Sequence, residues 1–453
     1  MISGDTIAAI ATAPGRGGVA VVRVSGSEAL SIAGRLTGKG SKFQDSSSKF
    51  QVLRLYSSQP ETSSLKPETF LDEAVVLLFR APHSYTGEDV VEFQCHGGTV
   101  TPRRVLAACL AAGARLARRG EFTERAFLNG RLDYTQAESV LNLIDAKTAR
   151  AADAALEGLS GRRARECRAL YESALDLSTR LEHALDIDEG ELPPDFLPSV
   201  NSRLSTLDSH LRAVLSKATE SRLLKSGALV VLAGPPNAGK SSLLNALLDE
   251  NRAIVSDSPG TTRDSIEAWI DLDGWPIRLV DTAGLREAKD EIEVEGVKRS
   301  EDLIAEADVV LMLRSCEGER VRSPQPSHLR TFTPSHLLNV TSKCDLGRGE
   351  GLNVSAKTGE GLDGLKRAIV AKLEEKVASS DSGDTPEGDV VAYQEALALL
   401  DGGRETGDVR REEDLVLMAN SVRAAAERLG EAIGATYSSD MLDNLFSRFC
   451  VGK

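Results

Sequence analysis

The sequence predicts a multidomain protein that combines an α+β domain, a helical bundle and an α/β domain inserted into that bundle. Three observations lead to this fold class: short apolar runs separated by turns near the start, three- and four-residue apolar spacing in two separate segments, and a strand–loop–helix unit between those segments. We assign residues 1–119 to the α+β domain, residues 120–223 and 379–453 to the bundle, and residues 224–378 to the inserted α/β domain.

The composition is that of a globular protein with several domains. The chain has 453 residues, of which 41% are apolar and 27% are charged, and its formal net charge is −14. No apolar run is long enough to cross a membrane and no charged-then-apolar leader precedes Asp5, so we expect a cytoplasmic protein. The six cysteines form no C-x-x-C pair, which argues against zinc and fits a reducing compartment.

The first domain shows the pattern of a mixed α+β unit. Strand-like runs at residues 19–24, 73–79 and 90–93 precede a helical segment at 102–112. The Ser-rich stretch 41–64 is expected to be a surface loop.

Helical periodicity occurs in two separate segments. Prolines at 193 and 194 interrupt the first, and a polar, acidic linker at 379–389 precedes the second. Two such segments on either side of an intact α/β unit predict that the unit is inserted into one bundle. The periodic apolar positions are Leu170, Ala174, Leu177, Leu181, Leu185, Leu204, Leu207, Leu211 and Val214 in the first segment, and Leu415, Met418, Val422, Leu429 and Ile433 in the second.

The strongest chemical signal is the loop at residues 234–241, GPPNAGKS, which has the form G-x-x-x-x-G-K-S. An apolar strand at 229–233 precedes it and a helix-forming run at 242–248 follows, so backbone N–H groups and a helix N-terminus would converge on bound phosphates. Lys240 would reach the β- and γ-phosphates, and the Ser241 hydroxyl would hold Mg²⁺. The alternative is a Gly-rich turn without a ligand, but it leaves the nucleotide motifs downstream unexplained.

Those downstream motifs select guanine. A strand at 277–280 ends in the D-x-x-G run 281–284, and a later strand leads into residues 342–345, SKCD. Asp345 can accept two hydrogen bonds that guanine offers and adenine does not. The run 355–357, SAK, fits the loop that closes over the base. Ser342 replaces the Asn of the usual N-K-x-D, which predicts weaker guanine binding in an otherwise Ras-like P-loop GTPase domain.

Hydrolysis needs a different arrangement from Ras, because Leu285 occupies the position of the water-orienting glutamine. The segment 254–264 could provide the groups for this arrangement. Thr262 would complete the Mg²⁺ shell. Carbonyls around Pro259 and Gly260, with Asn237, could bind a monovalent cation beside the phosphates. A mobile switch loop without an ion is the alternative. The predicted GTP-binding residues are Asn237, Ala238, Gly239, Lys240, Ser241, Ser242, Ser256, Asp257, Ser258, Pro259, Gly260, Thr261, Thr262, Asp281, Thr282, Ala283, Gly284, Lys343, Asp345, Ser355, Ala356 and Lys357.

Further motifs extend over nearly the whole chain. They are DTI at 5–7, PGRGGV at 14–19, YTGED at 85–89, EFTERAFLNG at 121–130, DTAGLR at 281–286 and FCVGK at 449–453. Together with Asn237 they resemble the MnmE (TrmE) family of potassium-activated GTPases. The resemblance implies an enzyme that modifies the wobble uridine of certain tRNAs, adding a carboxymethylaminomethyl or aminomethyl group at carbon 5 from a folate-borne one-carbon unit.

The resemblance also implies the ion sites and the partners. Potassium would be held by Asn237, Ser256, Ser258 and Thr261, and Mg²⁺ by Ser241 and Thr262. Glu293 would orient the attacking water, although it could equally be one of several solvated acids at a charged helix start. The implied partners are a second copy bound through the N-terminal domain, the flavoprotein MnmG (GidA) in a heterotetramer-like complex, which would bring FAD and NADH chemistry, and tRNA.

A folate-binding-like first domain follows from the same resemblance. Formyl-tetrahydrofolate would be held by Arg23, Glu88, Arg131 and Lys453, where Glu88 suits the pterin N–H groups and the cations suit the glutamate tail. Without the resemblance, each of these would be an ordinary surface ion pair. Cys450 would act on the one-carbon unit or shape its pocket, whereas its aromatic neighbours alone suggest a buried core thiol.

RNA binding is not established by charge. The candidate clusters are better explained as solvated helix faces. They comprise Arg162, Arg163, Arg165 and Arg168 in one segment and Arg115, Arg118 and Arg119 in another. The alternative function is a non-catalytic GTP-dependent switch in ribosome assembly or RNA binding, which predicts a basic RNA-binding module that the sequence lacks. Residues 317–335 and the arginine at 314, where the family usually carries an acid, are unexplained.

Overall fold

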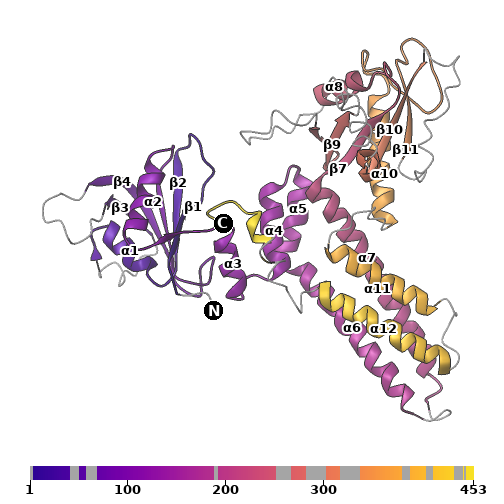
Figure 1. The fold of residues 1–453 in the computed structure, drawn as a ribbon, viewed down its shortest axis with the longest axis horizontal. Coiled ribbons are helices and arrows are strands. Elements are labelled where there is room, and N and C mark those ends of the chain that lie inside the picture. The colour runs from indigo at the N-terminus through magenta and orange to yellow at the C-terminus, as the bar shows by residue number, and fades with distance from the viewer. Residues whose placement is uncertain are drawn as a thin grey trace, which may run out of the picture. The chain divides into compact units, whose positions relative to one another are not determined.

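The computed structural model describes residues 4–40, 50–57, 69–187, 192–250, 267–281, 302–316, 337–379, 388–404, 412–432, 442 and 445–453. Its contacts divide the chain into two compact units, Met1–Leu141 with Tyr437–Lys453, and Asn142–Thr436 (Figure 1). This division does not test the four ranges assigned from the sequence, which stay a prediction. No helix in the described part of the chain has the length and apolar character needed to cross a membrane.

The first unit is built on a six-stranded sheet in the order β3-β4-β5-β2-β1-β6. Neighbouring strands are antiparallel, except that β6 runs parallel to β1. Helices α1 (Ala29–Leu36) and α2 (Thr101–Ala111) pack on one face, while Phe122 of α3 (Glu121–Leu128) packs on the other against Ile7. The predicted α+β class is therefore confirmed. The strands are β1 (Ile7–Ile10), β2 (Val19–Ser25), β3 (Phe50–Tyr56), β4 (Phe70–Phe79), β5 (Val90–His96) and β6 (Arg115–Leu116).

The expectation of a surface loop at 41–64 is wrong for its described part. Residues 50–56 form strand β3, which pairs with β4 from Phe50↔Leu77 to Tyr56↔Phe70. The run FQVLRLY is rich in β-branched, aromatic and other apolar residues, a strand signal that the serines on both sides obscured. The remaining residues of this stretch, apart from Ser57, lie outside the described part of the chain.

The helical part of the second unit has one core built from two distant segments. Helices α6 (Arg162–Leu185) and α7 (Phe196–Ser226) run alongside α11 (Gly388–Arg404) and α12 (Glu412–Ala432), as Figure 1 shows. Leu177 and Leu207 share a single buried cluster with Ala396 and Val422. The predicted insertion of the α/β unit into one bundle is confirmed. The shorter helices α4 (Tyr134–Asp145) and α5 (Ala149–Leu159) precede α6, and the periodic position Ile433 lies outside the described residues.

The inserted part is a six-stranded sheet in the order β12-β11-β10-β7-β9-β8, parallel except for β8. Alternate residues of β7 enter two separate clusters: Val230 lies on the face covered by α8 and α10, and Val231 lies on the opposite face. Burial on both faces is typical of a parallel α/β sheet and confirms that prediction. The elements are β7 (Ala228–Ala233), α8 (Lys240–Glu250), β8 (Glu267–Leu272), β9 (Trp275–Asp281), β10 (Val309–Ser315), β11 (Leu337–Ser342), β12 (Leu352–Asn353) and α10 (Leu362–Ala378).

Candidate functional site

The phosphate-binding loop connects the end of β7 to the start of α8, as its sequence predicts. Asn237 adopts the left-handed conformation at φ +63°, which asparagine tolerates better than most residues. The Lys240 ammonium donates to the carbonyls of Gly234 at 3.0 Å and Pro235 at 2.9 Å, and the side chain is almost fully buried. These contacts hold the ammonium within the loop, where phosphates would be bound.

Ser241 and Asp281 meet directly beside this loop. The Ser241 hydroxyl donates to Oδ2 of Asp281 at 2.6 Å, and Asp281 is only 2% exposed. The two residues come together because β7 and β9 are parallel neighbours whose carboxyl ends share one edge of the sheet. A hydroxyl and a carboxylate are hard oxygen ligands, so these residues fit a magnesium ion.

The guanine motif is folded as one unit with the 355–357 run. Oδ1 of Asp345 accepts a hydrogen bond from the Ser355 hydroxyl at 2.7 Å, which fixes the carboxylate. The N–H of Cys344 donates to the Val354 carbonyl at 3.1 Å, so the two loops are also joined through the backbone. Lys343 is in the left-handed region at φ +58°, and Lys357 is exposed.

Ser342 has a role that the sequence did not reveal. Its hydroxyl donates to the Ala238 carbonyl at 2.7 Å and to the Arg314 carbonyl at 3.2 Å, and it is 4% exposed. The residue therefore ties the guanine loop to the phosphate loop. Its place in the fourth nucleotide motif was the only signal in the sequence, and that signal predicted only weaker guanine binding than asparagine would give.

Several predicted site residues lie outside the described part of the chain. They belong to the 254–264 segment and to residues 282–293, so of the proposed potassium ligands only Asn237 has a described position. The residues concerned are Ser256, Asp257, Ser258, Pro259, Gly260, Thr261, Thr262, Thr282, Ala283, Gly284 and Glu293.

A second candidate site forms where the last residues of the chain dock onto the first unit. Val451 makes an antiparallel bridge with Arg119, whose Nε donates to the Phe449 carbonyl at 2.9 Å, and the N–H of Phe122 donates to the Lys453 carbonyl at 3.2 Å. Gly452 permits this docking because it has φ +103° and a Cβ there would lie 2.2 Å from the Ile10 carbonyl oxygen.

Arg23 and Lys453 lie together at this docking point. Nη1 of Arg23 donates to the Gly452 carbonyl at 3.4 Å, and Nε pairs with Glu92 at 2.8 Å. The guanidinium lies 5.2 Å from the centre of the Tyr85 ring, within cation–π range. Burial, followed by the positive charge of Arg23, lowers the pKa of Lys453. Arg23 and Lys453 therefore place two cations beside the Glu92 carboxylate.

Glu88 is partly buried and belongs to an ionic network around the buried Arg125, not to an isolated surface ion pair. Its carboxylate accepts from the Ser25 hydroxyl at 2.7 Å and from Nη1 of Arg125 at 3.1 Å. Arg125 is 2% exposed and also donates to Asp5 at 2.7 Å. Nothing in the sequence distinguished Arg125 within its motif. Arg131 lies close to the loop between β4 and β5 that carries Glu88, since its Nε donates to the Ser84 carbonyl at 3.0 Å.

Cys450 is exposed, so the interpretation of this residue as a core thiol is wrong. Phe446 and Phe449 occupy the buried positions instead, at 4% and 0% exposure. The backbone of Cys450 is fixed, because its carbonyl accepts from the N–H groups of Gly120 and Lys453.

Some members of the arginine clusters form ion pairs, namely Arg115, Arg118 and Arg162. Arg162 pairs with Glu157 at 2.9 Å and with Glu166 at 3.0 Å, and Arg118 pairs with Glu124 at 2.9 Å. Such pairing reduces the positive potential available to a phosphate backbone.

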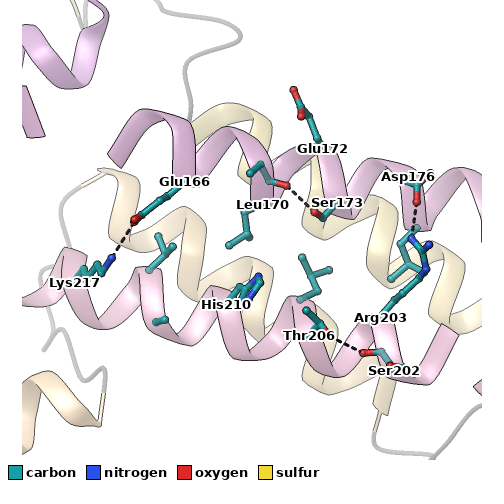
Figure 2. A pocket seen from close by; sticks show the side chains of 15 residues that line it. Glu166, Leu170, Glu172, Ser173, Asp176, Ser202, Arg203, Thr206, His210 and Lys217 are labelled. Atoms are coloured by element: carbon teal, nitrogen blue, oxygen red, sulfur yellow. Dashed lines mark hydrogen bonds and ion pairs between the residues drawn. The ribbon is translucent and has the colours of Figure 1, made fainter. Parts of the chain in front are cut away.

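A groove between α6 and α7 contains none of the predicted site residues (Figure 2). Ion pairs span it at two points, Glu166–Lys217 at 3.0 Å and Asp176–Arg203 at 2.8 Å. It carries no feature of a nucleotide or folate site.

Comparison with known proteins gives a consistent result. Residues 6–131 match the family described as GTP-binding protein TrmE N-terminus, and residues 134–450 match the MnmE helical domain. The tRNA modification GTPase MnmE of Moorella thermoacetica is 41% identical over 99% of both chains. The proteins of the same name from Acaryochloris marina and Symbiobacterium thermophilum are 39% and 40% identical, again over 99% of each chain. The chain belongs to the MnmE family.

Proposed function

We propose that this protein is a GTPase that acts in the modification of the wobble uridine of tRNA. The observation that carries the proposal is the contact of Ser241 with Asp281 at 2.6 Å beside the buried Lys240, since this is the arrangement that a magnesium-bound triphosphate requires. The anchored carboxylate of Asp345 supports guanine as the base. The test is turnover of GTP against ATP by the purified chain, with Asp345→Asn as the variant that should lose the preference.

Potassium is proposed to replace an arginine finger beside the phosphates, with Asn237, Ser256, Ser258 and Thr261 as ligands and Thr262 joining Ser241 on Mg²⁺. GTP turnover in KCl should exceed turnover in NaCl at equal ionic strength, which separates ion coordination from screening. Asn237→Gly keeps the left-handed backbone at φ +63° but removes the side-chain oxygen, so it should lose the potassium effect. Asn237→Asp, which retains an oxygen, is the matched control. Equal rates in both salts would contradict the proposal.

Glu293 is proposed to orient the attacking water. Glu293→Ala should abolish GTP turnover and leave GTP binding intact, because the carboxylate would act on the water and not on the nucleotide. Normal turnover by this variant would remove Glu293 from the mechanism.

Formyl-tetrahydrofolate is proposed to bind at the docked C-terminal residues. The adjacent cations Arg23 and Lys453 suit its glutamate tail, and the fixed carboxylate of Glu88 suits the pterin N–H groups, with Arg131 as a further contact. Lys453→Gln should weaken folate binding measured by calorimetry, whereas Lys372→Gln, on α10, should not. The exposed thiol of Cys450 would act on or beside the one-carbon unit, and a Cys450→Ser variant that supports full tRNA modification would exclude that role.

A homodimer through the first unit is proposed from exposed apolar residues of β3, on the sheet face opposite α1 and α2. Phe50 and Val52 on β3 are 69% and 65% exposed, and Val52 pairs with the half-buried Val75 of β4 on that face. Val52→Asp should shift the chain towards a monomer in light scattering. Val416→Asp on α12, where the side chain is 43% exposed, should not.

The flavoprotein MnmG is the proposed second partner, supplying FAD and NADH chemistry to a complex that acts on tRNA in the cytoplasm. Modified uridine should form only when both proteins, GTP and the folate are present, as measured by nucleoside mass spectrometry.

A further inference from the structure

The hairpin β8–β9 carries both tryptophans of the chain, Trp269 and Trp275. Its two ends lead into the nucleotide-sensing segments, since Glu267 follows the 254–264 segment in the chain and Asp281 closes the magnesium site. The hairpin register, from Glu267↔Val280 to Leu272↔Trp275, makes it a single ladder. A displacement of Trp275 along β9 would therefore move Asp281.

Two cations from the helical part lie against the two tryptophan rings. Nζ of Lys147 is 4.8 Å from the centre of the Trp269 ring, and Cζ of Arg150 is 4.1 Å from the centre of the Trp275 ring. Both distances are within the range of cation–π attraction. Thr148 accepts from the N–H of Ala151 at 3.2 Å and so caps α5, which fixes the start of the helix between the two cations.

Arg150 is itself held from a second side. Its Nη2 donates to Glu220 of α7 at 2.6 Å and its Nε to the same oxygen at 3.2 Å. The hairpin turn also approaches closely: Gly274 has φ +85°, and a Cβ there would lie 3.0 Å from Cβ of Arg150. The neighbouring Ala151 is buried in the same cluster as Trp275.

Resting on the proposed GTPase function, we infer that Arg150 is a positioning residue for GTP hydrolysis, which acts through Trp275 and β9 on Asp281. Arg150 joins α5, α7 and the hairpin at one point, and the β7–β9 ladder connects the hairpin to the strand that precedes the phosphate loop. Through this contact, nucleotide state and helix position influence each other.

The experiment uses the purified full-length chain. Because no other tryptophan is present, tryptophan emission reports on the surroundings of Trp269 and Trp275 in this hairpin. Wild-type emission should differ between GDP and a non-hydrolysable GTP analogue. In Arg150→Gln this difference should disappear, and kcat should fall by about 10- to 100-fold with little change in the affinity for the analogue, as expected for a misplaced catalytic constellation. Arg150→Lys, which keeps the charge, should restore part of both signals.

The matched control is Arg180→Gln, which removes a surface ion pair with Asp176 at 2.9 Å on α6 and touches no part of the hairpin. It should behave as the wild type. The inference is overturned if the wild type hydrolyses GTP but shows the same tryptophan emission in both nucleotide states, or if Arg150→Gln retains the wild-type kcat. A wild-type chain without GTP turnover contradicts the proposed function itself, which is a different result.

Discussion

Replacing Ser342 by alanine tests whether the guanine loop is anchored on the phosphate loop. The substitution removes the donor at 2.7 Å from the Ala238 carbonyl, and Ala238 is 1% exposed. A buried acceptor left without its donor costs roughly 1–3 kcal/mol. When nucleotide binding orders the guanine loop, this free-energy cost reduces the binding free energy, so the affinity for GDP should fall about 5- to 150-fold.

The assay is calorimetric titration with GDP and IDP. Asp345 is fixed independently by Ser355 at 2.7 Å, so Ser342→Ala should weaken both nucleotides by the same factor and leave base selectivity unchanged. Ser205→Ala removes a hydroxyl that donates to the Asn201 carbonyl at 3.0 Å on the exposed side of α7, and it should have no effect. Unchanged GDP affinity in Ser342→Ala, or a loss confined to GDP, would refute the reasoning.

Three further outcomes are expected. Burial acts to raise the pKa of Glu121, but hydrogen bonds from Arg115, the Arg118 N–H and Arg125, with the positive charge of Arg115, together outweigh it and lower the pKa from 4.5 to about 2. Glu121 therefore stabilises the fold above pH 4.5, this contribution is lost as the pH falls towards 2, and Glu121→Gln should lack that part of the pH dependence in denaturant titrations. Gly452→Ala should release the residues around Lys453 and weaken folate binding without changing GTP turnover, and unaltered folate affinity would contradict the docking argument. Asp308→Asn leaves the buried ammonium of Lys376, 3.0 Å away, without its negatively charged partner and should lower the free energy of unfolding by about 3–5 kcal/mol, and a smaller loss would mean that the pair is not structural.

The features that were predictable from sequence are those encoded over short distances. The loop at 234–241 lies in consecutive residues between a strand and a helix, so its position and the placement of Lys240 and Ser241 follow from a local pattern. The bundle was predictable for a similar reason, because helical spacing repeats every few residues and needs no knowledge of the partner helix.

The features that were missed depend on residues far apart in the chain. Ser342 and Ala238 are separated by 104 positions, and Arg125 and Asp5 by 120. Neither pair leaves a local pattern, since a serine or an arginine looks alike whether it faces solvent or a buried carbonyl. Strand β3 was missed for the opposite reason: its seven residues carry a local strand signal, but the composition around them favoured a loop.

At both candidate sites, one residue is expected to contact the ligand and a second residue fixes the first. The motif residues Asp345 and Glu88 are expected to touch the ligand, yet each carboxylate is fixed by a separate residue, Ser355 in one case and the buried Arg125 in the other. An unfixed carboxylate would have to lose side-chain freedom on binding, whereas a fixed one already has the required geometry. Ser355 and Arg125 therefore influence the ligand affinity of Asp345 and Glu88. Substitution of Ser355 or Arg125 should weaken ligand binding even when Asp345 and Glu88 are unchanged.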